Sequence, residues 1–220
     1  MNPNTTENFD TLTRNAAKDH TILLGSYKNH AGTTYGNAYA AHDLTNPLTA
    51  HVLIEGPTGS GKTVLVQNYL RTADQFPDEF TATYISNRDS YSSNYPATSF
   101  SEAADLLEEI DKELIERQDI LEHAGLRNMN ELEASDNTDI PPRHIVIIDD
   151  LLNLLKDAEH ADRGNSVVDI VEWITRIGRS AGVHLVATTQ SERELSRIFD
   201  TDVLLPVIRF RADGVLMEKS

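Results

Sequence analysis

One glycine-rich segment of this chain has residue types and spacing that suit phosphate binding. Gly56 is followed after four residues by Gly61, Lys62 and Thr63, which is the pattern of a P-loop. Glycines let backbone N–H groups turn inward around phosphate oxygens, lysine reaches the β- and γ-phosphates, and the hydroxyl ligates Mg²⁺. The pattern predicts a nucleoside triphosphate site with Thr63 as a magnesium ligand. The predicted binding residues are Gly56, Pro57, Thr58, Gly59, Ser60, Gly61, Lys62 and Thr63.

Two adjacent carboxylates lie about 90 residues downstream, directly after the apolar run 145–148. An apolar strand that ends in Asp-Asp is common by itself, but downstream of a P-loop it suits the second element of a nucleotide site. Asp149 is predicted to hold Mg²⁺, directly or through water. Asp150 is predicted to orient and deprotonate the attacking water.

A third strand-like run, residues 183–188, leads to Gln190. If this strand lies between the one before the P-loop and the one before Asp149, Gln190 comes close to the γ-phosphate. It could there sense the phosphate or position the water. On local grounds alone, an ordinary turn at a strand end explains the same residues equally well.

The elements that would position these residues alternate between strand and helix. This order indicates an α/β fold with a mostly parallel central sheet and helices on both faces. The β-type runs are 52–55, 81–86, 145–148 and 183–188, with a fifth candidate at 207–211. The helical patterns are 64–70, 102–124 and 166–181, and Ser99 with Glu102 predicts a capping box for the second.

The remaining segments have weaker signals. Residues 1–20 are polar and are expected to form a flexible N-terminal arm. Residues 21–25 suggest a short strand, and a turn-rich region follows to about residue 47. Residues 126–143 are expected to be a polar linker, and 213–220 a C-terminal tail.

Composition narrows the class of protein. At 220 residues the chain has room for one substantial α/β domain. It has no cysteine, no signal-peptide pattern and no apolar run of about 20 residues, so we expect a cytoplasmic location without direct membrane insertion. The net charge is −16, and residues 101–140 account for −10 of it with 13 acidic and three basic residues. Such a localised acidic face does not favour DNA binding, although it leaves other surfaces free for it.

With these residues identified, the chain resembles the FtsK/SpoIIIE family of motor ATPases over about residues 21–212. The lead-in to the P-loop from His42 is similar to that family, and the most specific segment is Arg176–Gln190. That segment is shared by DNA translocases and by the ATPase modules of type VII secretion. Residues 191–211 are similar to the secretion modules. The resemblance implies one ATPase core at 21–212.

The resemblance implies a RecA-like P-loop NTPase that uses ATP and Mg²⁺ and assembles as a homo-hexamer or a mixed ring. Such rings thread a polymer, and neighbouring subunits share their active sites. We expect a DNA translocase for DNA transfer or segregation, with Lys62, Asp150 and Gln190 as the catalytic residues. The alternatives are an ATPase for protein export, with a protein substrate, and a weakly active nucleotide-binding regulatory subunit of a ring.

Three features depart from the family pattern. Asp150 stands where the family usually has glutamate, and Val207 stands where relatives carry an arginine that reaches the neighbouring subunit. Residues 86–89 replace the Asp-Pro-Lys-type turn that the family has after its second core strand. Arg209 or Arg211 is the candidate replacement for that trans-acting arginine. Turnover is therefore expected to be weak. The family's pore loop corresponds to residues 155–165, where Lys156 and Arg163 are the candidate polymer contacts, although a plain solvent loop explains them equally well.

Overall fold

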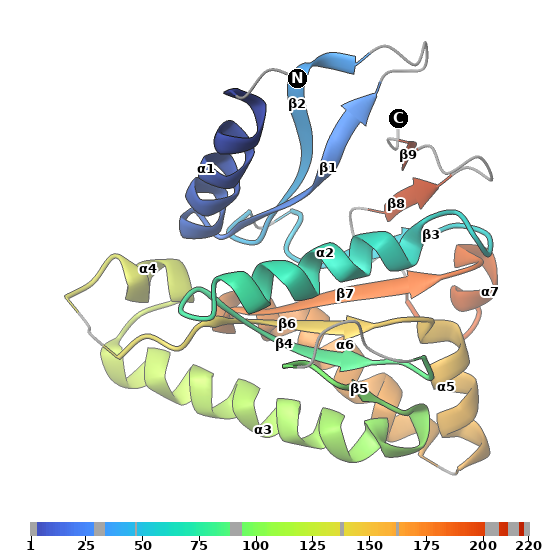
Figure 1. The fold of residues 1–220 in the computed structure, drawn as a ribbon. Helices are drawn as coiled ribbons and strands as arrows, with labels where there is room; N and C mark the ends of the chain where they lie inside the picture. The colour runs from blue at the N-terminus through green and yellow to red at the C-terminus, as the bar shows by residue number, and fades with distance from the viewer. Residues whose placement is uncertain are drawn as a thin grey trace.

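The computed structural model describes residues 4–28, 34–46, 48–88, 94–136, 139–161, 163–200, 207–210 and 216–217. Its centre is a sheet in which every neighbouring pair is parallel except the last. Five of its strands are the predicted ones, and they lie side by side (Figure 1). The strand order is β5 (Ala97–Thr98), β4 (Phe80–Ile85), β6 (Arg143–Ile148), β7 (Val183–Thr189), β3 (Val52–Glu55), β8 (Val207–Phe210) and β9 (Leu216–Met217).

Helices cover both faces of this sheet, as the alternation of elements predicts. Helix α2 (Lys62–Gln75) lies on one face, and α3 (Phe100–Ala124), α5 (Leu151–His160) and α6 (Gly164–Ala181) pack on the other (Figure 1). Strand β6 supplies both cores, because Ile145 and Ile147 face α2 while Val146 and Ile148 face the other layer. Burial on both faces explains why this strand has no polar residue between His144 and Asp149.

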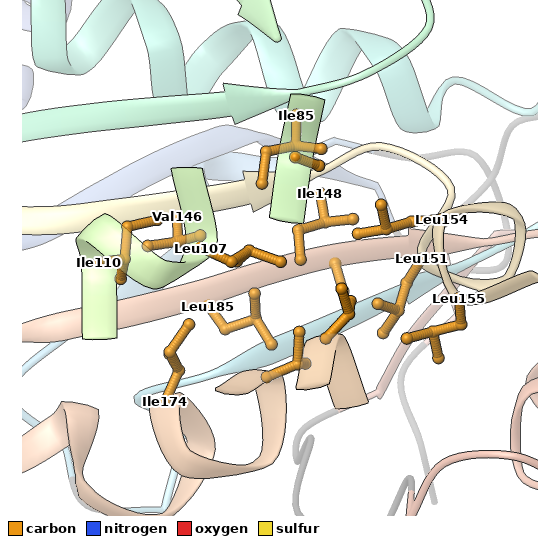
Figure 2. Packing of buried hydrophobic residues seen from close by; sticks show 14 of the residues in the cluster. Ile85, Leu107, Ile110, Val146, Ile148, Leu151, Leu154, Leu155, Ile174 and Leu185 are labelled. Carbon is orange, nitrogen blue, oxygen red and sulfur yellow. The ribbon is translucent and has the colours of Figure 1, made fainter. Parts of the chain in front are cut away.

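The core beneath α3, α5 and α6 is built from alternate strand residues and one apolar stripe of each helix. Figure 2 shows this packing for side chains of β4, β6, β7 and the three helices: Ile85, Val146, Ile148, Leu185, Leu107, Ile110, Leu151, Leu154, Leu155 and Ile174. All of them are buried. Because α5 starts directly after Asp150, this packing anchors the residues that follow the carboxylate pair.

The N-terminal region differs from the prediction. Helix α1 (Asn4–Lys18) replaces the expected flexible arm, and β1 (Thr21–Lys28) pairs antiparallel with β2 (Thr34–Asp43), where a turn-rich region was expected. The hairpin packs over α2, and Asn68 Nδ2 donates a hydrogen bond of 2.9 Å to the Leu24 carbonyl. Ala17, Ile22 and Leu24 are buried. Their partners are distant in sequence, so the local pattern does not reveal this layer.

Residues 126–143 are not a simple linker, because they include helix α4 (Met129–Glu133). Met129 and Leu132 are buried against Leu121. The Nη2 atom of the buried Arg143 lies 2.9 Å from Glu133 Oε2. This ion pair fixes α4 at the start of β6, at the opposite end of that strand from Asp149. The polar composition that suggested a linker thus includes a side chain used inside the fold.

The capping box predicted for Ser99 and Glu102 is also different in detail. The Ser99 hydroxyl donates to the Glu102 carboxylate at 2.7 Å, and its side chain makes no cap hydrogen bond. Instead, the first backbone N–H of α3, that of Phe100, donates to Asn87 Oδ1 at 2.9 Å. A residue from the turn after β4 therefore stabilises the start of α3.

Two glycines near the end of α6 allow close packing, Gly178 against β7 and Gly182 against α4. A Cβ atom on Gly178 would lie 2.5 Å from the Val183 carbonyl oxygen. Gly182, which ends α6, has φ of +71°, and a Cβ there would lie 2.9 Å from Met129 Cγ. Both positions therefore require glycine, for clearance at the first and for clearance and backbone conformation at the second.

Four histidines are buried near the end of the sheet away from the P-loop, and the pKa values of three of them, His42, His51 and His184, are lowered. His42 Nδ1 lies 2.7 Å from the Tyr69 hydroxyl, and His184 Nδ1 lies 3.1 Å from the Ala50 carbonyl oxygen. His51 Nδ1 accepts a hydrogen bond of 3.0 Å from the Leu185 backbone N–H. Burial lowers the pKa of His42 to about 4 and that of His51 to about 3, and it lowers the pKa of His184 well below 6.5. All three are therefore held neutral.

Candidate nucleotide-binding site

The P-loop connects β3 to α2 at the carboxyl end of the sheet. Gly59 and Gly61 have φ of +81° and +104°, a region that residues with side chains rarely occupy. Gly61 is the N-cap of α2 and provides no side-chain cap, so the first N–H groups of this helix remain directed toward the loop. The Ser60 hydroxyl is buried without a hydrogen-bond partner among the described residues. The loop is thus a concave set of donors at a helix N-terminus, which suits an anion.

Lys62 extends along the inside of this loop. Its Nζ atom donates to the Gly56 carbonyl at 2.5 Å and to the Pro57 carbonyl at 3.1 Å. Burial lowers the pKa of Lys62, the charges of Asp149 and Asp150 act in the opposite direction, and Arg88 adds to the lowering. The Lys62 ammonium group therefore contacts two carbonyls of the loop and is also attracted by the charges of Asp149 and Asp150.

Asp149 ends β6 and is 5% exposed. Its Oδ1 accepts a hydrogen bond of 2.7 Å from the Thr188 hydroxyl, and its Oδ2 lies 3.4 Å from the Tyr84 hydroxyl. These partners come from β7 and β4, the two strands that flank β6. The carboxylate is therefore oriented from both sides.

Asp150 has a left-handed backbone conformation, with φ of +81° and ψ of 64°. Aspartate tolerates this region better than most residues. Its backbone N–H donates to Thr188 Oγ1 at 2.9 Å, and its Oδ2 accepts from Asn153 Nδ2 at 2.7 Å. The turn directs the Asp150 carboxylate to the same cavity as Asp149.

Gln190 is close to the P-loop, as the predicted strand order requires. Strand β7 lies between β6 and β3, which confirms the arrangement expected from the sequence. Thr58 Oγ1 lies 3.4 Å from Gln190 Oε1, and the Gly56 N–H donates to the Thr189 carbonyl at 3.2 Å. The predicted catalytic residues Lys62, Asp150 and Gln190 all line one cavity.

That cavity has a volume of about 290 Å³, and a second hollow of about 410 Å³ adjoins it. The two share Asp149, Asp150, Gln190 and Arg88. Arg88 was not among the predicted site residues, although the turn that carries it, residues 86–89, departs from the family pattern. The first cavity is lined by Thr58, Gly59, Ser60, Gly61, Lys62, Thr63, Val64, Arg88, Asp149, Asp150, Thr188 and Gln190.

The donor set suits magnesium together with a nucleotide. Mg²⁺ prefers oxygen ligands and is usually held by one or two carboxylates plus substrate phosphates and water. Thr63 and Asp149 offer a hydroxyl and an oriented carboxylate within one cavity. No cluster of three or more His, Cys, Asp or Glu side chains that could hold a metal exists in the described part of the chain. The site therefore fits a metal that arrives with the nucleotide.

The residues predicted for the pore lie in a different setting. Residues 155–165 are largely helical, because α5 continues to His160 and α6 begins at Gly164, so a long loop was a wrong expectation. Arg163 Nη1 lies 2.6 Å from Asp105 on α3, and Arg163 also pairs with Glu108. Lys156 Nζ lies 3.9 Å from Glu194. Both candidate cations thus already face carboxylates.

Of the two candidate trans-acting arginines, Arg209 lies on a described strand, β8. Strand β8 is parallel to β3, and Arg209 is in register with Glu55, the last residue before the P-loop. Val207 is in register with Leu53. The backbone of Arg209 therefore lies beside the P-loop strand of its own chain. Arg211 lies outside the described residues, and the role of both arginines stays a prediction.

Comparison with known families agrees with this geometry. The family model described as "AAA domain" matches residues 48–198, which include the P-loop, both aspartates and Gln190. The chain belongs to the AAA domain family. Its predicted fold class, an α/β P-loop NTPase with a mostly parallel sheet, is thereby confirmed together with the strand order.

Relatives of this AAA domain protein include DNA translocases. It is 29% identical to the DNA translocase FtsK of Staphylococcus aureus over 177 residues, which is 70% of this chain and 22% of that protein. It is 28% identical to FtsK of Listeria monocytogenes over 161 residues, or 64% of this chain and 20% of that protein. The chain thus spans about a fifth of these relatives, and its resemblance to FtsK-type motor ATPases is confirmed.

Solved structures share the fold of this AAA domain. The pCW3 conjugation coupling protein TcpA with ATPγS has a TM-score of 0.68 at 20% identity, covering 87% of this chain and 54% of that one. The Thermomonospora curvata EccC ATPases 2 and 3, in complex with a signal sequence peptide, have a TM-score of 0.70 at 15% identity. That match covers 87% of this chain and 36% of the EccC chain. No described helix is both long enough and apolar enough to span a membrane.

Proposed function

We propose that this chain is the ATP-binding and ATP-hydrolysing core of an FtsK-type motor that moves DNA. The observation that carries the proposal is the convergence of Lys62, Asp149, Asp150 and Gln190 on one cavity bounded by the P-loop. A cation, a metal-binding carboxylate, a general base and a polar sensor are the parts that phosphoryl transfer to water requires. They come from the adjacent strands β3, β6 and β7 and the loops that follow them.

Each residue has a separate role in this mechanism. The N–H groups of residues 58–63 surround the phosphates, and Lys62 neutralises charge on the β- and γ-oxygens. Thr63 and Asp149 would hold the magnesium ion, which would offset negative charge on the phosphates. Asp150 accepts the proton of the attacking water, and Gln190 fixes the position of that water.

DNA as the moved polymer is supported by the curated FtsK relatives, which align over most of this chain. A second candidate, protein export, is favoured by a specific observation. Lys156 and Arg163, the predicted polymer contacts, are paired with carboxylates, and the chain carries a net charge of −16. Paired cations on an acidic surface suit a peptide cargo better than a polyphosphate.

A ring of six chains or a mixed ring in the cytoplasm belongs to this proposal. So does the weakly active alternative, in which the chain binds ATP as a regulatory subunit and a partner supplies the missing arginine. Val207 is the feature that supports that alternative, because no arginine occupies the position expected to reach a neighbouring site.

Steady-state ATP hydrolysis across protein concentrations, with long duplex DNA, with an export-signal peptide or with neither, tests these readings. A motor that moves DNA predicts a rate that rises with protein concentration, increases severalfold with DNA and falls with salt. Stimulation by peptide alone would favour export. A wild-type rate equal to that of Lys62→Ala, despite ATP binding, would favour the regulatory subunit and contradict an active motor.

A further inference from the structure

The turn after β4 brings an arginine into the P-loop cavity. Strand β4 is the neighbour of β6, and the Asp149 N–H donates to the Ile85 carbonyl at 2.9 Å. Three residues beyond Ile85, the Arg88 Nη1 atom lies 3.4 Å from Thr63 Oγ1. Arg88 and Lys62 are the residues that bring positive charge to the described lining of the cavity and its adjoining hollow.

Hydrogen bonds hold the backbone that leads from β4 to Arg88. The Arg88 N–H donates to Ser86 Oγ at 3.1 Å, and the Ser86 N–H donates to the Thr98 carbonyl at 2.9 Å. Between them, Asn87 Oδ1 accepts the hydrogen bond from Phe100 at the start of α3. The turn is thus tied to the parallel strand β5 and to a helix, so the position of Arg88 at the cavity follows from the fold.

The charge balance of the cavity leaves a need for this second cation. Apart from Arg88, the charged residues that line the first cavity are Lys62, Asp149 and Asp150, so two carboxylates oppose one ammonium group. A triphosphate brings further negative charge, and a guanidinium can bind two phosphate oxygens at once. Thr63 would help to hold the metal ion that neutralises charge on the β- and γ-phosphates of a bound nucleotide. A guanidinium beside Thr63 is therefore near the terminal phosphate.

We propose that Arg88 binds the γ-phosphate of a nucleotide held in the P-loop of its own chain, so that the site distinguishes ATP from ADP. The inference rests on the proposed function, because it requires a triphosphate in the P-loop. Arg88 supplies within one chain a positive charge that the sequence suggested only from a neighbouring subunit. Preference for ATP is then a property of the single chain and does not depend on ring assembly.

Equilibrium binding of fluorescent ATPγS and ADP with Mg²⁺, at protein concentrations where the chain is monomeric, tests this assignment. For Arg88→Ala we expect an ATPγS affinity about tenfold lower, the loss of one charge-assisted contact, and an ADP affinity within about twofold of wild type. The ATPγS affinity of Arg88→Lys should lie between that of wild type and that of Arg88→Ala. Arg71→Ala is the matched control, since Arg71 is exposed on α2 outside the cavity lining. Equal losses for both nucleotides, or no loss, would overturn the proposal.

The same binding measurements test the P-loop nucleotide site separately from the role proposed for Arg88. If wild type binds ATPγS no better than Lys62→Ala, the P-loop assignment fails, and the Arg88 proposal fails with it. If binding depends on Lys62 but Arg88→Ala keeps the preference of wild type for ATPγS, only the Arg88 proposal is overturned.

Mixing two defective variants checks that Arg88 acts within its own chain. Arg88→Ala retains an intact P-loop, and Lys62→Ala retains Arg88. If Arg88 serves its own site, no mixture of the two regains the hydrolysis rate of wild type. Recovery in the mixture would assign Arg88 to the site of a neighbouring subunit and contradict the proposal.

Discussion

The Thr188 hydroxyl donates a hydrogen bond of 2.7 Å to Asp149 Oδ1, so a residue of β7 orients the carboxylate at the end of β6. The oxygen of the Thr188 hydroxyl also accepts a hydrogen bond of 2.9 Å from the Asp150 backbone N–H. One buried hydroxyl thereby fixes both the proposed magnesium ligand and the backbone of the proposed base. Any movement of β7 relative to β6 would disturb both together.

Thr188→Val should separate this positioning from general stability. Valine keeps the shape but leaves Asp149 without its donor, so we expect ATP hydrolysis at least about tenfold slower and a loss of about 1–3 kcal/mol in unfolding free energy. Rates and denaturant titrations measure the two effects. Thr189→Val is the control, because the Thr189 hydroxyl contacts Ser191 and neither aspartate. Equal rates for both variants would refute a specific role for Thr188.

Asp150→Asn should remove the base while preserving the turn. Asparagine tolerates the left-handed conformation as aspartate does, so we expect a change of no more than about 0.5 kcal/mol in unfolding free energy. ATP affinity should remain, and hydrolysis should fall to the level of Lys62→Ala. Thermal melts, nucleotide binding and single-turnover hydrolysis provide the measurements. Hydrolysis at the wild-type rate would show that another group takes the proton.

Stability should fall as the pH is lowered from 6.5 toward 4. His42 and His51 have folded pKa values of about 4 and about 3, below the ordinary 6.5, and that of His184 is also lowered. Between these pKa values, the three histidines therefore bind protons in the unfolded chain but not in the folded chain. Stability is full above pH 6.5, and each histidine removes about 1.4 kcal/mol per pH unit below it.

Urea denaturation at pH 7.5, 6.0 and 5.0 measures this slope. Glu113 and Glu133, whose pKa values are lowered from 4.5 by histidine and arginine partners, add to the loss only at still lower pH. His42→Gln should reduce the slope by about one proton. An unfolding free energy that is unchanged between pH 7.5 and 5.0 would contradict neutral burial of these histidines.

In three glycine-to-alanine variants, the loss of unfolding free energy should increase as the space for the added methyl group decreases. Gly125 has φ of +69° and open space around a Cβ, so Gly125→Ala measures backbone strain alone, at about 1–2 kcal/mol. Gly182→Ala adds a contact with the flexible Met129 and should lose more. Gly178→Ala meets a carbonyl oxygen of the backbone at 2.5 Å and should lose about 3 kcal/mol or more. Chemical denaturation gives the ranking, and equal losses at all three would contradict it.

The sequence was sufficient to predict the five central strands of the sheet and the cavity at its carboxyl edge, but not the edge strands β5 and β9, the latter within the expected C-terminal tail. Apolar runs such as 145–148 identify strands that are buried on both faces, and parallel strands bring their ends to one edge. The P-loop spacing identified the phosphate-binding turn, and Gln190 followed once β7 was placed between β6 and β3.

Thr188 and Arg88 were not predicted, for a physical reason. The importance of Thr188 depends on which strand lies beside Asp149, and that is a property of strand order. Arg88 reaches Thr63 from a turn whose path is set by hydrogen bonds to β5 and α3. Helix α1 and strand β2 were missed because the partners of the N-terminal layer are remote in sequence, whereas α4 was missed because it has only five residues, of which two are buried.

Gly178 within α6 and Gly182 at its end limit what the family resemblance can indicate about function. Gly178 and Gly182 lie within Arg176–Gln190, the segment with the most specific likeness to both DNA translocases and secretion ATPases. Gly178 gives clearance for the Val183 carbonyl of β7, and Gly182 combines a left-handed backbone with clearance for Met129 of α4. Any motor built on this backbone needs them, whatever it transports. Likeness at these two glycines therefore reflects what the fold requires and does not indicate which polymer is moved.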